Sequence, residues 1–210
     1  ARLKTGDQVA IRPQSLRLGI AKLTENNAAT ENAQKGRSVP TWLSYNEEKR
    51  VPYLIHRLKQ GESIALVSDA GTPGISDPAF HILRAAVVTG IPVKAIPGPA
   101  AFLPALIVSG LPMHRFVFEG FLPLKKGRKT RIEELAQEKR TIILYESPHR
   151  LIMTLQQILE HFGDREISLS RELTKKFEEV LRGKLSAVLQ ALSSRSLKGE
   201  FVIVLAGKPK

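Results

Sequence analysis

Apolar residues in the first half of the chain recur with the spacings of alternating helices and strands. Val51, Leu54, Ile55 and Leu58 fall at i, i+3, i+4 and i+7, which predicts an amphipathic helix that Gly61 ends. The elements expected after it are a strand at residues 64–67, a helix at 78–88, a strand at 93–96 and a helix that runs through residue 108. This repeating order of strand, loop and helix indicates an α/β layer with parallel strands.

A second unit is indicated after Leu111 and Pro112, where the helical pattern breaks. Its expected elements are a strand at residues 115–121, a basic helix at 125–139, a strand at 141–145, a helix capped by Ser147 and Pro148 that reaches residue 162, and strands at 167–170 and 201–205. We therefore predict an α/β fold with two domains, at residues 42–112 and 113–210. They follow an unassigned polar segment at residues 1–41, where Leu16, Leu18 and Ile20 make a short alternation.

Basic residues outnumber acidic residues by 32 to 20, which gives a net charge of +12 and a sequence pI of about 10.1. Such an excess favours polyanionic partners through long-range attraction and the release of counterions. RNA, DNA and an anionic membrane surface all fit it, and in some proteins it serves solubility alone. The charge therefore permits a nucleic-acid partner without choosing one.

Other features of the composition exclude whole classes of site. The chain has no cysteine, which excludes disulfide bonds, thiolate nucleophiles and zinc held by cysteine. Its five histidines form no H-x-x-x-H pair, so we expect no metal. No apolar run approaches the ~18 residues of a membrane span, and the N-terminus lacks a secretory apolar core. We therefore expect a cytoplasmic protein that has no membrane partner.

The segment Ser68-Asp-Ala-Gly-Thr-Pro-Gly-Ile-Ser-Asp77 directly follows a predicted buried strand. In open α/β sheets, ligands bind beyond the carboxyl ends of strands, and glycines let the backbone approach them closely. The segment matches neither a P-loop nor G-x-G-x-x-G, but it predicts a cofactor site in which Asp69 holds a ribose or an ammonium group. The alternative is that Gly71 and Gly74 only make a tight turn and that Asp77 only caps a helix.

Three further features carry candidate chemistry. Gly98, in the next turn between strand and helix, either admits a ligand or is structural. Glu119 and Glu146 stand at the ends of apolar strands, where a general base would suit, although each is open to interpretation as a cap or an ion pair. The segment at residues 125–131 has five bases and no acid, so it is either a phosphate grip or a flexible basic loop. The mixed charges at residues 171–180 are typical of a solvated face.

Six motifs, taken together and in this order, resemble one family. They are Ser68-Asp-Ala-Gly-Thr-Pro-Gly-Ile-Ser-Asp-Pro78, Ile96-Pro-Gly-Pro99, Phe118-Glu-Gly-Phe-Leu-Pro123, Tyr145-Glu-Ser-Pro-His-Arg-Leu151, Arg171-Glu-Leu-Thr-Lys-Lys176 and Lys198-Gly-Glu200. The family is the small-subunit (16S) ribosomal RNA cytidine 2′-O-ribose methyltransferases, a branch of the tetrapyrrole methylase superfamily.

The resemblance implies a two-domain tetrapyrrole-methylase-like fold with a cofactor cleft between the domains. It further implies S-adenosylmethionine as cofactor, a cytidine of 16S rRNA in the small ribosomal subunit as substrate, and a homodimer. The residues implied as cofactor contacts are Asp69, Ala70, Gly71, Thr72, Pro73, Gly98, Tyr145, Arg171, Glu172, Lys198 and Glu200. Candidates for the base are Glu146, then Glu119 and Asp77. Those for RNA contacts are Lys125, Lys126, Arg128, Lys129 and Arg131.

The sequence departs from the family at residues 1–41. These residues contain neither the Gly-Thr-Pro-Ile-Gly-Asn loop nor the Glu-Asp-Thr-Arg segment that members usually have near their start. We expect either that the sequence is part of a longer protein or that this member lacks one wall of the pocket. Two alternative functions stay open: a tetrapyrrole methyltransferase, whose carboxylate-rich substrate would also suit a basic site, and a ribosome-binding module that does not methylate.

Overall fold

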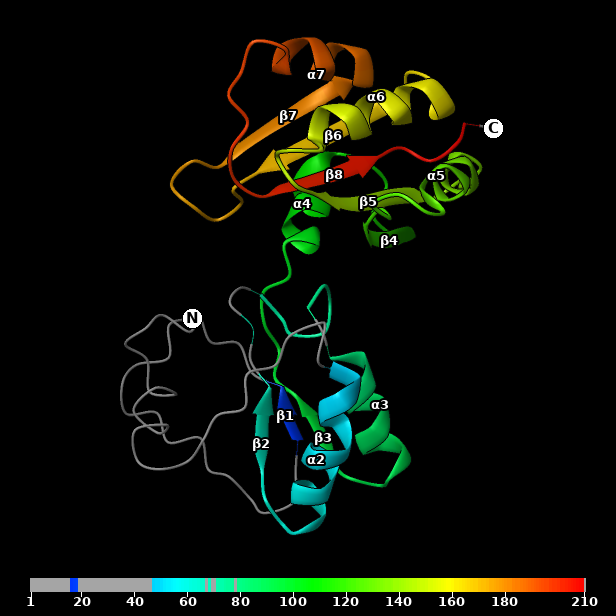
Figure 1. The fold of residues 1–210 in the computed structure, drawn as a ribbon. Coiled ribbons are helices and arrows are strands. Elements are labelled where there is room, and N and C mark those ends of the chain that lie inside the picture. The colour runs from blue at the N-terminus through cyan, green and yellow to red at the C-terminus, as the bar shows by residue number, and fades with distance from the viewer. Residues whose placement is uncertain (1–15, 19–46, 67, 69–70, 78, 210) are drawn as a thin grey trace. The chain divides into compact units, whose positions relative to one another are not determined.

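A computed structural model describes residues 16–18, 47–66, 68, 71–77 and 79–209 of the chain. The chain divides into two compact units, residues 1–100 and residues 101–210. Each combines a β-sheet with helices (Figure 1). The predicted α/β fold class is therefore confirmed. No helix among the described residues is long and apolar enough to span a membrane.

The sheet of the first unit has three parallel strands in the order β2-β1-β3. The strands are β1 (Leu16–Leu18), β2 (Ile64–Leu66) and β3 (Val93–Ala95), and the helices are α2 (Glu47–Lys59) and α3 (Phe80–Val88). Leu16 pairs with both Ile64 and Val93, so β1 joins two strands that do not pair with each other. Leu54 and Leu58 of α2 pack with Ile82 of α3 in the core, on the apolar face that the sequence predicts.

The first unit differs from the sequence prediction in three places. Residues 16–18, part of the segment that we left unassigned, form a strand. The sequence did not predict it because a three-residue strand is stabilised by pairing with β2 and β3, which are distant along the chain. Helix α3 begins after Ala79, so Asp77 is not its N-cap. The boundary between the units falls after Ala100, ahead of the break at Leu111 and Pro112 that we used to place it.

The second unit has a mixed five-stranded sheet in the order β4-β5-β8-β6-β7. The strands are β4 (Phe116–Phe121), β5 (Thr141–Glu146), β6 (Glu166–Arg171), β7 (Glu179–Lys184) and β8 (Phe201–Leu205); the helices are α4 (Phe102–Ser109), α5 (Arg128–Ala136), α6 (Leu151–Phe162) and α7 (Leu185–Leu192). Strand β8 is antiparallel to both neighbours, β5 and β6. Strands β4, β5 and β6 therefore end at one edge of the sheet, where β7 and β8 begin, and we call it the carboxyl edge.

The two faces of this sheet are covered differently (Figure 1). On one face, which we call the α4 face, Leu106 of α4 packs against Ile143 of β5 and Val204 of β8. This packing places α4 in the second unit, although the sequence prediction assigned it to the first. Helices α5, α6 and α7 cover the other face around Leu155 and Ile203, which are fully buried.

Strand β4 carries a β-bulge. Phe118 lies opposite Ile143 and Phe121 lies opposite Tyr145, so three residues of β4 span the distance that two residues of β5 span. Gly120 takes the left-handed conformation there, at φ +71°. Because side chains alternate between faces, the extra residue puts Phe121 on the α4 face together with Phe118.

Some elements of the second unit also differ from the prediction. Strand β7 and helix α7 were not predicted, and β7 contains part of the charge run that we expected to be only a solvated face. Helix α5 begins at Arg128, after Gly127 at φ +78°, so Lys125 and Lys126 precede it. Helix α6 begins after Arg150, so Ser147 starts a turn and is not the cap.

Truncation of Leu155 tests the core of the second unit. Leu155→Ala should lower the free energy of unfolding by roughly 2–5 kcal/mol, because it removes buried apolar atoms and leaves a cavity. Urea unfolding followed by circular dichroism measures this loss. Met153→Ala on the same helix is the control, since Met153 is 44% exposed and should lose much less. Equal losses would contradict the packing described for α6.

Candidate functional site

Two loops of the first unit meet beyond the carboxyl ends of β2 and β3. The backbone N–H and the hydroxyl group of Thr72 both donate to the carbonyl oxygen of Pro99, each at 3.0 Å. The hydroxyl group of Ser68 donates to the carbonyl oxygen of Gly71 at 2.9 Å, which tightens the first loop. The structure thus joins two of the predicted cofactor segments, the loop of Thr72 and the turn of Gly98, at one edge of the sheet.

Gly71 stands at the closest approach of these loops. Its φ of +75° belongs to the left-handed region, and a Cβ atom built there would lie 3.3 Å from the carbonyl oxygen of Pro99. Glycine therefore suits this conformation, and a larger residue would crowd the carbonyl oxygen of Pro99. Pro73 is buried beside it, whereas Asp77 and Gly98 are exposed. Asp69 and Ala70, which we also predicted as cofactor contacts, lie outside the described residues.

Four predicted residues come together at the carboxyl edge of the second sheet. Arg171 donates from Nε to the carbonyl oxygen of Lys198 at 2.7 Å. The backbones of Glu172 and Glu200 are joined by an N–H···O bond of 3.0 Å, and the N–H of Glu200 donates to the Glu172 carboxylate at 2.9 Å. The motif that follows β6 and the motif that precedes β8 therefore form one structure.

Two residues of this structure were quoted in the motifs without a role. The ammonium group of Lys175 lies 3.1 Å from the carboxylates of both Glu172 and Glu200. A Cβ atom at Gly199 would lie 2.6 Å from the Cγ atom of Glu172, and Gly199 has a φ of +100°, so a larger residue would strain the backbone and displace the Glu172 side chain. The glycine between Lys198 and Glu200 was the one signal in the sequence that could have indicated this contact.

The environment of Glu172 favours its charged form. The backbone N–H of Glu200 donates to the carboxylate, and the nearby ammonium group of Lys175 acts in the same direction, so the pKa of Glu172 is lowered although burial opposes the shift. Glu172 also has a φ of +48°, which is rare outside glycine. The hydrogen bonds to Glu200 hold this unusual backbone in place.

Tyr145 lies at the same edge, at the end of β5. Its hydroxyl oxygen accepts a hydrogen bond of 3.1 Å from the backbone N–H of Phe102, and burial raises the pKa of the phenol. Its ring meets those of Phe118 and Phe121 in edge-to-face contacts, with centroids 5.1 and 5.7 Å apart. Tyr145 therefore has a fixed orientation.

Glu146 was our first candidate for the base, but it lies in a buried polar network. Its residue is 2% exposed, and its carboxylate accepts hydrogen bonds from the Thr154 hydroxyl group and the Ser147 N–H, both at 2.7 Å. The guanidinium group of Arg150 lies 2.8 Å away. Both carboxylate oxygens are engaged, which favours the alternative that Glu146 is an ion-paired structural residue.

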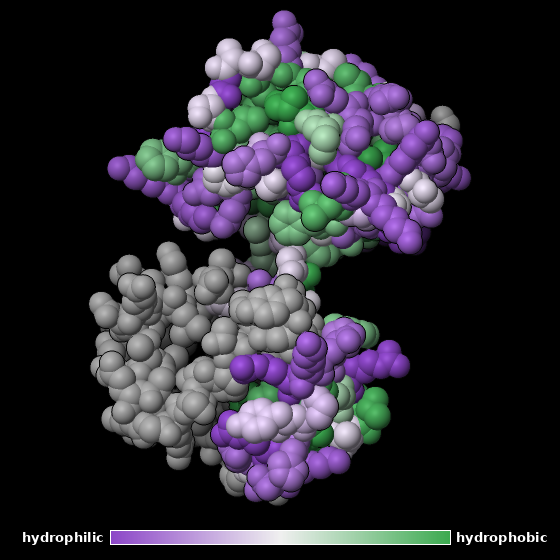
Figure 2. Space-filling model, viewed as in Figure 1, coloured by the Kyte–Doolittle hydropathy of each residue, from purple (hydrophilic) through white to green (hydrophobic). Residues whose placement is uncertain are grey.

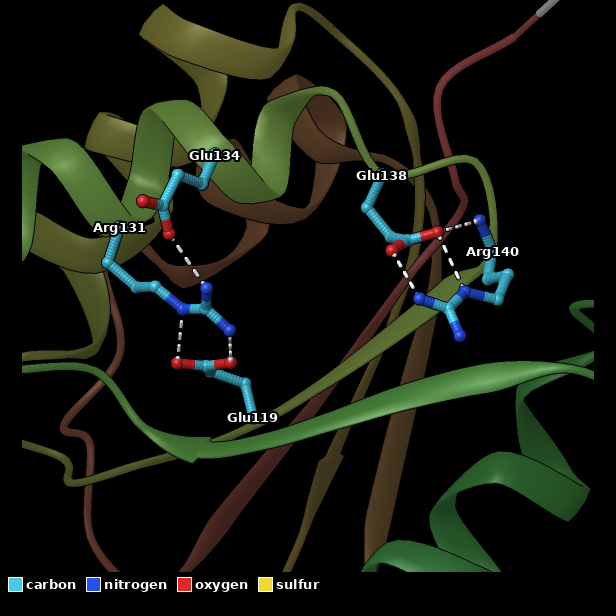
Figure 3. A network of polar contacts seen from close by, with 5 residues as sticks. All are labelled: Glu119, Arg131, Glu134, Glu138 and Arg140. Carbon is cyan, nitrogen blue, oxygen red and sulfur yellow. Dashed lines mark hydrogen bonds and ion pairs between the residues drawn. The ribbon is translucent and has the colours of Figure 1, made fainter.

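Glu119 is paired in a similar way (Figure 3). Glu119 is the extra residue of the β4 bulge, and its side chain faces α5. Its carboxylate accepts two hydrogen bonds from the guanidinium group of Arg131, one of them 2.7 Å long. Arg131 also contacts Glu134 at 2.8 Å. Nearby, the guanidinium group of Arg140 holds the pKa of Glu138 at about 2. Figure 3 shows these two arginines directed at carboxylates of their own unit, so the phosphate role predicted for Arg131 is not favoured.

Arg128 is the second predicted RNA contact that points inward. It is 5% exposed, and it donates to the Thr154 hydroxyl group, the Gln157 amide oxygen and the carbonyl oxygen of Pro123 at 2.7–3.0 Å. It thereby extends the network of Glu146, and the phosphate role predicted for it is corrected. The reason is that Gly127 turns the chain into α5 with Arg128 on its buried side.

The lysines of the basic segment remain on the surface. Lys125, Lys126 and Lys129 are exposed, and Lys129 lies 3.8 Å from Glu133. Within the part of the chain that the structure describes, Lys125 and Lys126 form no ion pair. On the face seen in Figure 2, hydrophilic side chains surround smaller hydrophobic patches. No group of three histidine or acidic residues among the described residues is arranged to hold a metal ion.

Comparison with known proteins gives close relatives. The family model described as Tetrapyrrole (Corrin/Porphyrin) Methylases matches residues 1–189. A protein of Thermotoga maritima named Ribosomal RNA small subunit methyltransferase I is 44% identical over 169 residues, which is 79% of this chain and 76% of that protein. A protein of Xylella fastidiosa with the same name is 49% identical over 168 residues, 78% of this chain and 62% of that protein. The chain thus spans about three fifths to three quarters of these relatives.

A solved structure supports the same fold. The uroporphyrin-III C-methyltransferase of Thermus thermophilus, in complex with S-adenosyl homocysteine, superimposes with a TM-score of 0.55 and 17% sequence identity, over 79% of this chain and 75% of that one. At this identity the likeness concerns the fold. It agrees with the tetrapyrrole-methylase-like fold that the motifs imply.

The lowered pKa of Glu172 predicts a pH-dependent stability. The charged carboxylate stabilises the folded state above its unfolded pKa of ~4.3, and this contribution is lost as the pH falls through the lower folded pKa. Glu172→Gln should therefore be less stable than the unmodified protein at pH 7, and the difference should shrink as the pH falls below ~4. Urea unfolding at a series of pH values measures it.

Glu133→Gln is the matched control, because the Glu133 side chain is 51% exposed and its ion pair with the Lys129 ammonium group is long, at 3.8 Å. It should change stability little at any pH. If Glu172→Gln and Glu133→Gln gave the same pH profile, the contacts of Glu172 would contribute nothing specific.

Proposed function

Because the chain belongs to the family of ribosomal RNA small subunit methyltransferase I, within the tetrapyrrole methylases, we propose that it methylates the ribose 2′-hydroxyl group of a cytidine in 16S rRNA with S-adenosylmethionine. The observation that carries the proposal is the identity of 44% to a relative of which the chain covers 76%. The structure adds that the shared motifs gather at the carboxyl edges of two sheets, where α/β proteins bind ligands.

The loops of the first unit fit S-adenosylmethionine. Thr72 joins the loop that follows β2 to the turn that follows β3 by hydrogen bonds to Pro99. Gly71 has no side chain to cover the backbone where the two loops meet. Backbone groups without a side chain in front of them can approach a nucleoside and a carboxylate closely. We assign Gly71, Thr72, Pro73 and Gly98 to this contact, together with Asp69 and Ala70 by the sequence pattern. The cofactor, when bound, supplies an electrophilic methyl group on its sulfonium.

The chain must also accept the proton that the ribose hydroxyl group gives up. The carboxylates of Glu146 and Glu119 are occupied by hydrogen bonds and arginine partners within the second unit. Asp77 is exposed, in the same loop as Gly71. Because this loop is the one that we assign to the cofactor, we place Asp77 ahead of Glu146 and Glu119 as the proton acceptor, which changes the order that the sequence suggested.

The proposal extends to the setting of the enzyme. We propose that 16S rRNA is bound within the small ribosomal subunit, and that the enzyme is a cytoplasmic homodimer; both rest on family membership. On the surface of the second unit, Leu103 and Ile107 of α4 are 45% and 64% exposed, so apolar area is available to a second copy. Analytical ultracentrifugation tests the homodimer, because it measures whether the protein sediments with the mass of two chains.

Transfer of labelled methyl groups tests the function. Purified protein is incubated with S-adenosylmethionine labelled in the methyl group and with either small ribosomal subunits or uroporphyrinogen. Label at one ribose of 16S rRNA, and none in the tetrapyrrole, is the expected result. Label in the tetrapyrrole alone would replace the proposal by the tetrapyrrole alternative. Binding of rRNA without binding of cofactor would indicate the module that does not methylate.

Gly71→Val should abolish binding of S-adenosylmethionine without unfolding the protein. The added atoms would press on the carbonyl oxygen of Pro99 and separate the two loops. Isothermal titration calorimetry measures the binding, and circular dichroism measures the fold.

Gly90→Val is the matched control for this change. Gly90 has a similar φ, +71° against +75°, but open space where its Cβ atom would stand. Both variants therefore carry the same backbone strain, and only one disturbs the loops. Normal cofactor binding by Gly71→Val would move the pocket elsewhere.

Replacement of Lys125 and Lys126 by glutamine should weaken RNA binding and flatten its dependence on salt. Each phosphate contact with a single strand contributes about 0.7 to the slope of log K against log salt, so the pair should lower that slope by about 1.4. Fluorescence anisotropy at several salt concentrations measures it, and cofactor affinity should stay the same. The control is the double variant Lys184→Gln and Lys208→Gln, whose ammonium groups contact Glu166 and Gln137. An unchanged slope would reject the phosphate contacts.

A further inference from the structure

A row of aromatic rings runs along the α4 face of the second sheet to its carboxyl edge. Phe102 of α4 stacks on Phe118 of β4, with centroids 4.5 Å apart and planes inclined by 28°. Phe118 meets Tyr145 edge to face, and Tyr145 meets Phe121 in the same way, with planes inclined by 63°. None of these phenylalanines is among the residues assigned to the proposed reaction.

Phe121 ends the row and differs from the other rings in exposure. The residue is 49% exposed, whereas Phe102, Phe118 and Tyr145 are partly buried and pack against the core. The place of this ring on the α4 face depends on the β-bulge of β4. In a regular strand of the same sequence, Phe121 would be three positions from Phe118 and would lie on the opposite face of the sheet, towards α5. Bulges commonly re-aim a side chain next to a functional site.

The ring of Phe121 is also held in place from behind. It meets Tyr145 in an edge-to-face contact, and Tyr145 is itself fixed by the hydrogen bond from the Phe102 backbone N–H and by the ring of Phe118. A ring that is already fixed loses little conformational freedom when a ligand stacks on it. Phe121 therefore offers a rigid and exposed aromatic surface.

The chain directly after Phe121 is basic. Leu124, Lys125 and Lys126 are exposed, and the ammonium groups of the two lysines have no ion-pair partner among the described residues. Lys125 is four residues from Phe121, which an extended chain spans in at most about 14 Å. An aromatic surface beside cations is how proteins hold unpaired nucleotides, with the ring on the base and the cations on phosphates.

We propose that Phe121 is a stacking platform for an unpaired base of the RNA substrate, with Lys125 and Lys126 on the adjacent phosphates. This rests on the proposed function and assigns it a substrate form: the target segment is bound single-stranded, since a base inside a duplex has no free face to stack on. The 2′-hydroxyl group of an unpaired nucleotide is also easier for an enzyme to reach than one inside a helix. Phe121 positions the substrate and takes no part in the transfer of the proton.

Binding of short RNA oligomers tests the platform. Fluorescence anisotropy compares the unmodified protein with Phe121→Leu and Phe121→Trp on three probes: a single-stranded oligocytidylate, the same oligomer in a duplex, and an abasic ribose-phosphate chain of equal length. Phe121→Leu should bind the oligocytidylate roughly tenfold more weakly, the size expected for loss of one stacked base. Phe121→Trp should retain the affinity. The affinity for the abasic chain should not change in either variant.

The control variant is Phe80→Leu, which removes another exposed aromatic ring, 62% exposed on α3 of the first unit. Equal affinities of Phe121→Leu and Phe80→Leu for the oligocytidylate would overturn the proposal. So would an equal loss on the abasic chain, which would mean a general effect on structure. Weaker binding of S-adenosylmethionine by Phe121→Leu in calorimetry, with RNA binding intact, would identify the adenine of the cofactor as the stacked base and likewise overturn it.

These outcomes are separable from those of the proposed function, because oligomer binding requires no methyl transfer. If the unmodified protein labelled no rRNA while Phe121→Leu still lost affinity for the oligocytidylate, the reaction would be wrong and the platform would stand. If rRNA were labelled and Phe121→Leu showed no loss, the reaction would stand without the platform. Under both proposals, Phe121→Leu should raise the KM for small ribosomal subunits.

Discussion

The position of β8 determines where the motifs of the second unit meet. This strand lies between β5 and β6 and is antiparallel to both, and each of its five residues is buried. Because β5 and β6 are both antiparallel to β8, they run in the same direction. Their carboxyl ends therefore reach the same edge, where Lys198 and Glu200 enter β8. The contacts of Arg171, Glu172 and Tyr145 at this edge follow from that pairing.

The sequence predicts those parts of the fold that depend on local patterns. The apolar face of α2 and the runs of β2 and β5 were readable from residue spacing. Strand β7 was missed because its Glu179 and Arg182 resemble a solvated charge run, although an edge strand with one exposed side tolerates them. The bulge at Gly120 was missed because one extra residue changes register without changing composition.

The candidate site divides in a similar way. Motifs that our prediction placed together do meet: Arg171 contacts Lys198, and Thr72 contacts Pro99. They meet because the order of the strands brings the loops at their ends together. Individual side chains were less predictable. Arg128 and Glu146 resemble a phosphate contact and a base in sequence, but a shared hydrogen-bond partner, Thr154, joins them to one buried network. No spacing in the sequence reveals that a threonine on α6 lies between them.

The two sheets also differ in the order in which synthesis supplies their central strands. In the first unit β1 is made before β2 and β3, so each partner finds its neighbour already present when it emerges. In the second unit the central strand β8 is made after all four of the others. Until residue 205 has been added, β5 and β6 have unpaired edges facing each other, which are the kind of surface that other chains can join. The second unit therefore keeps a gap at the centre of its sheet until β8 has been made.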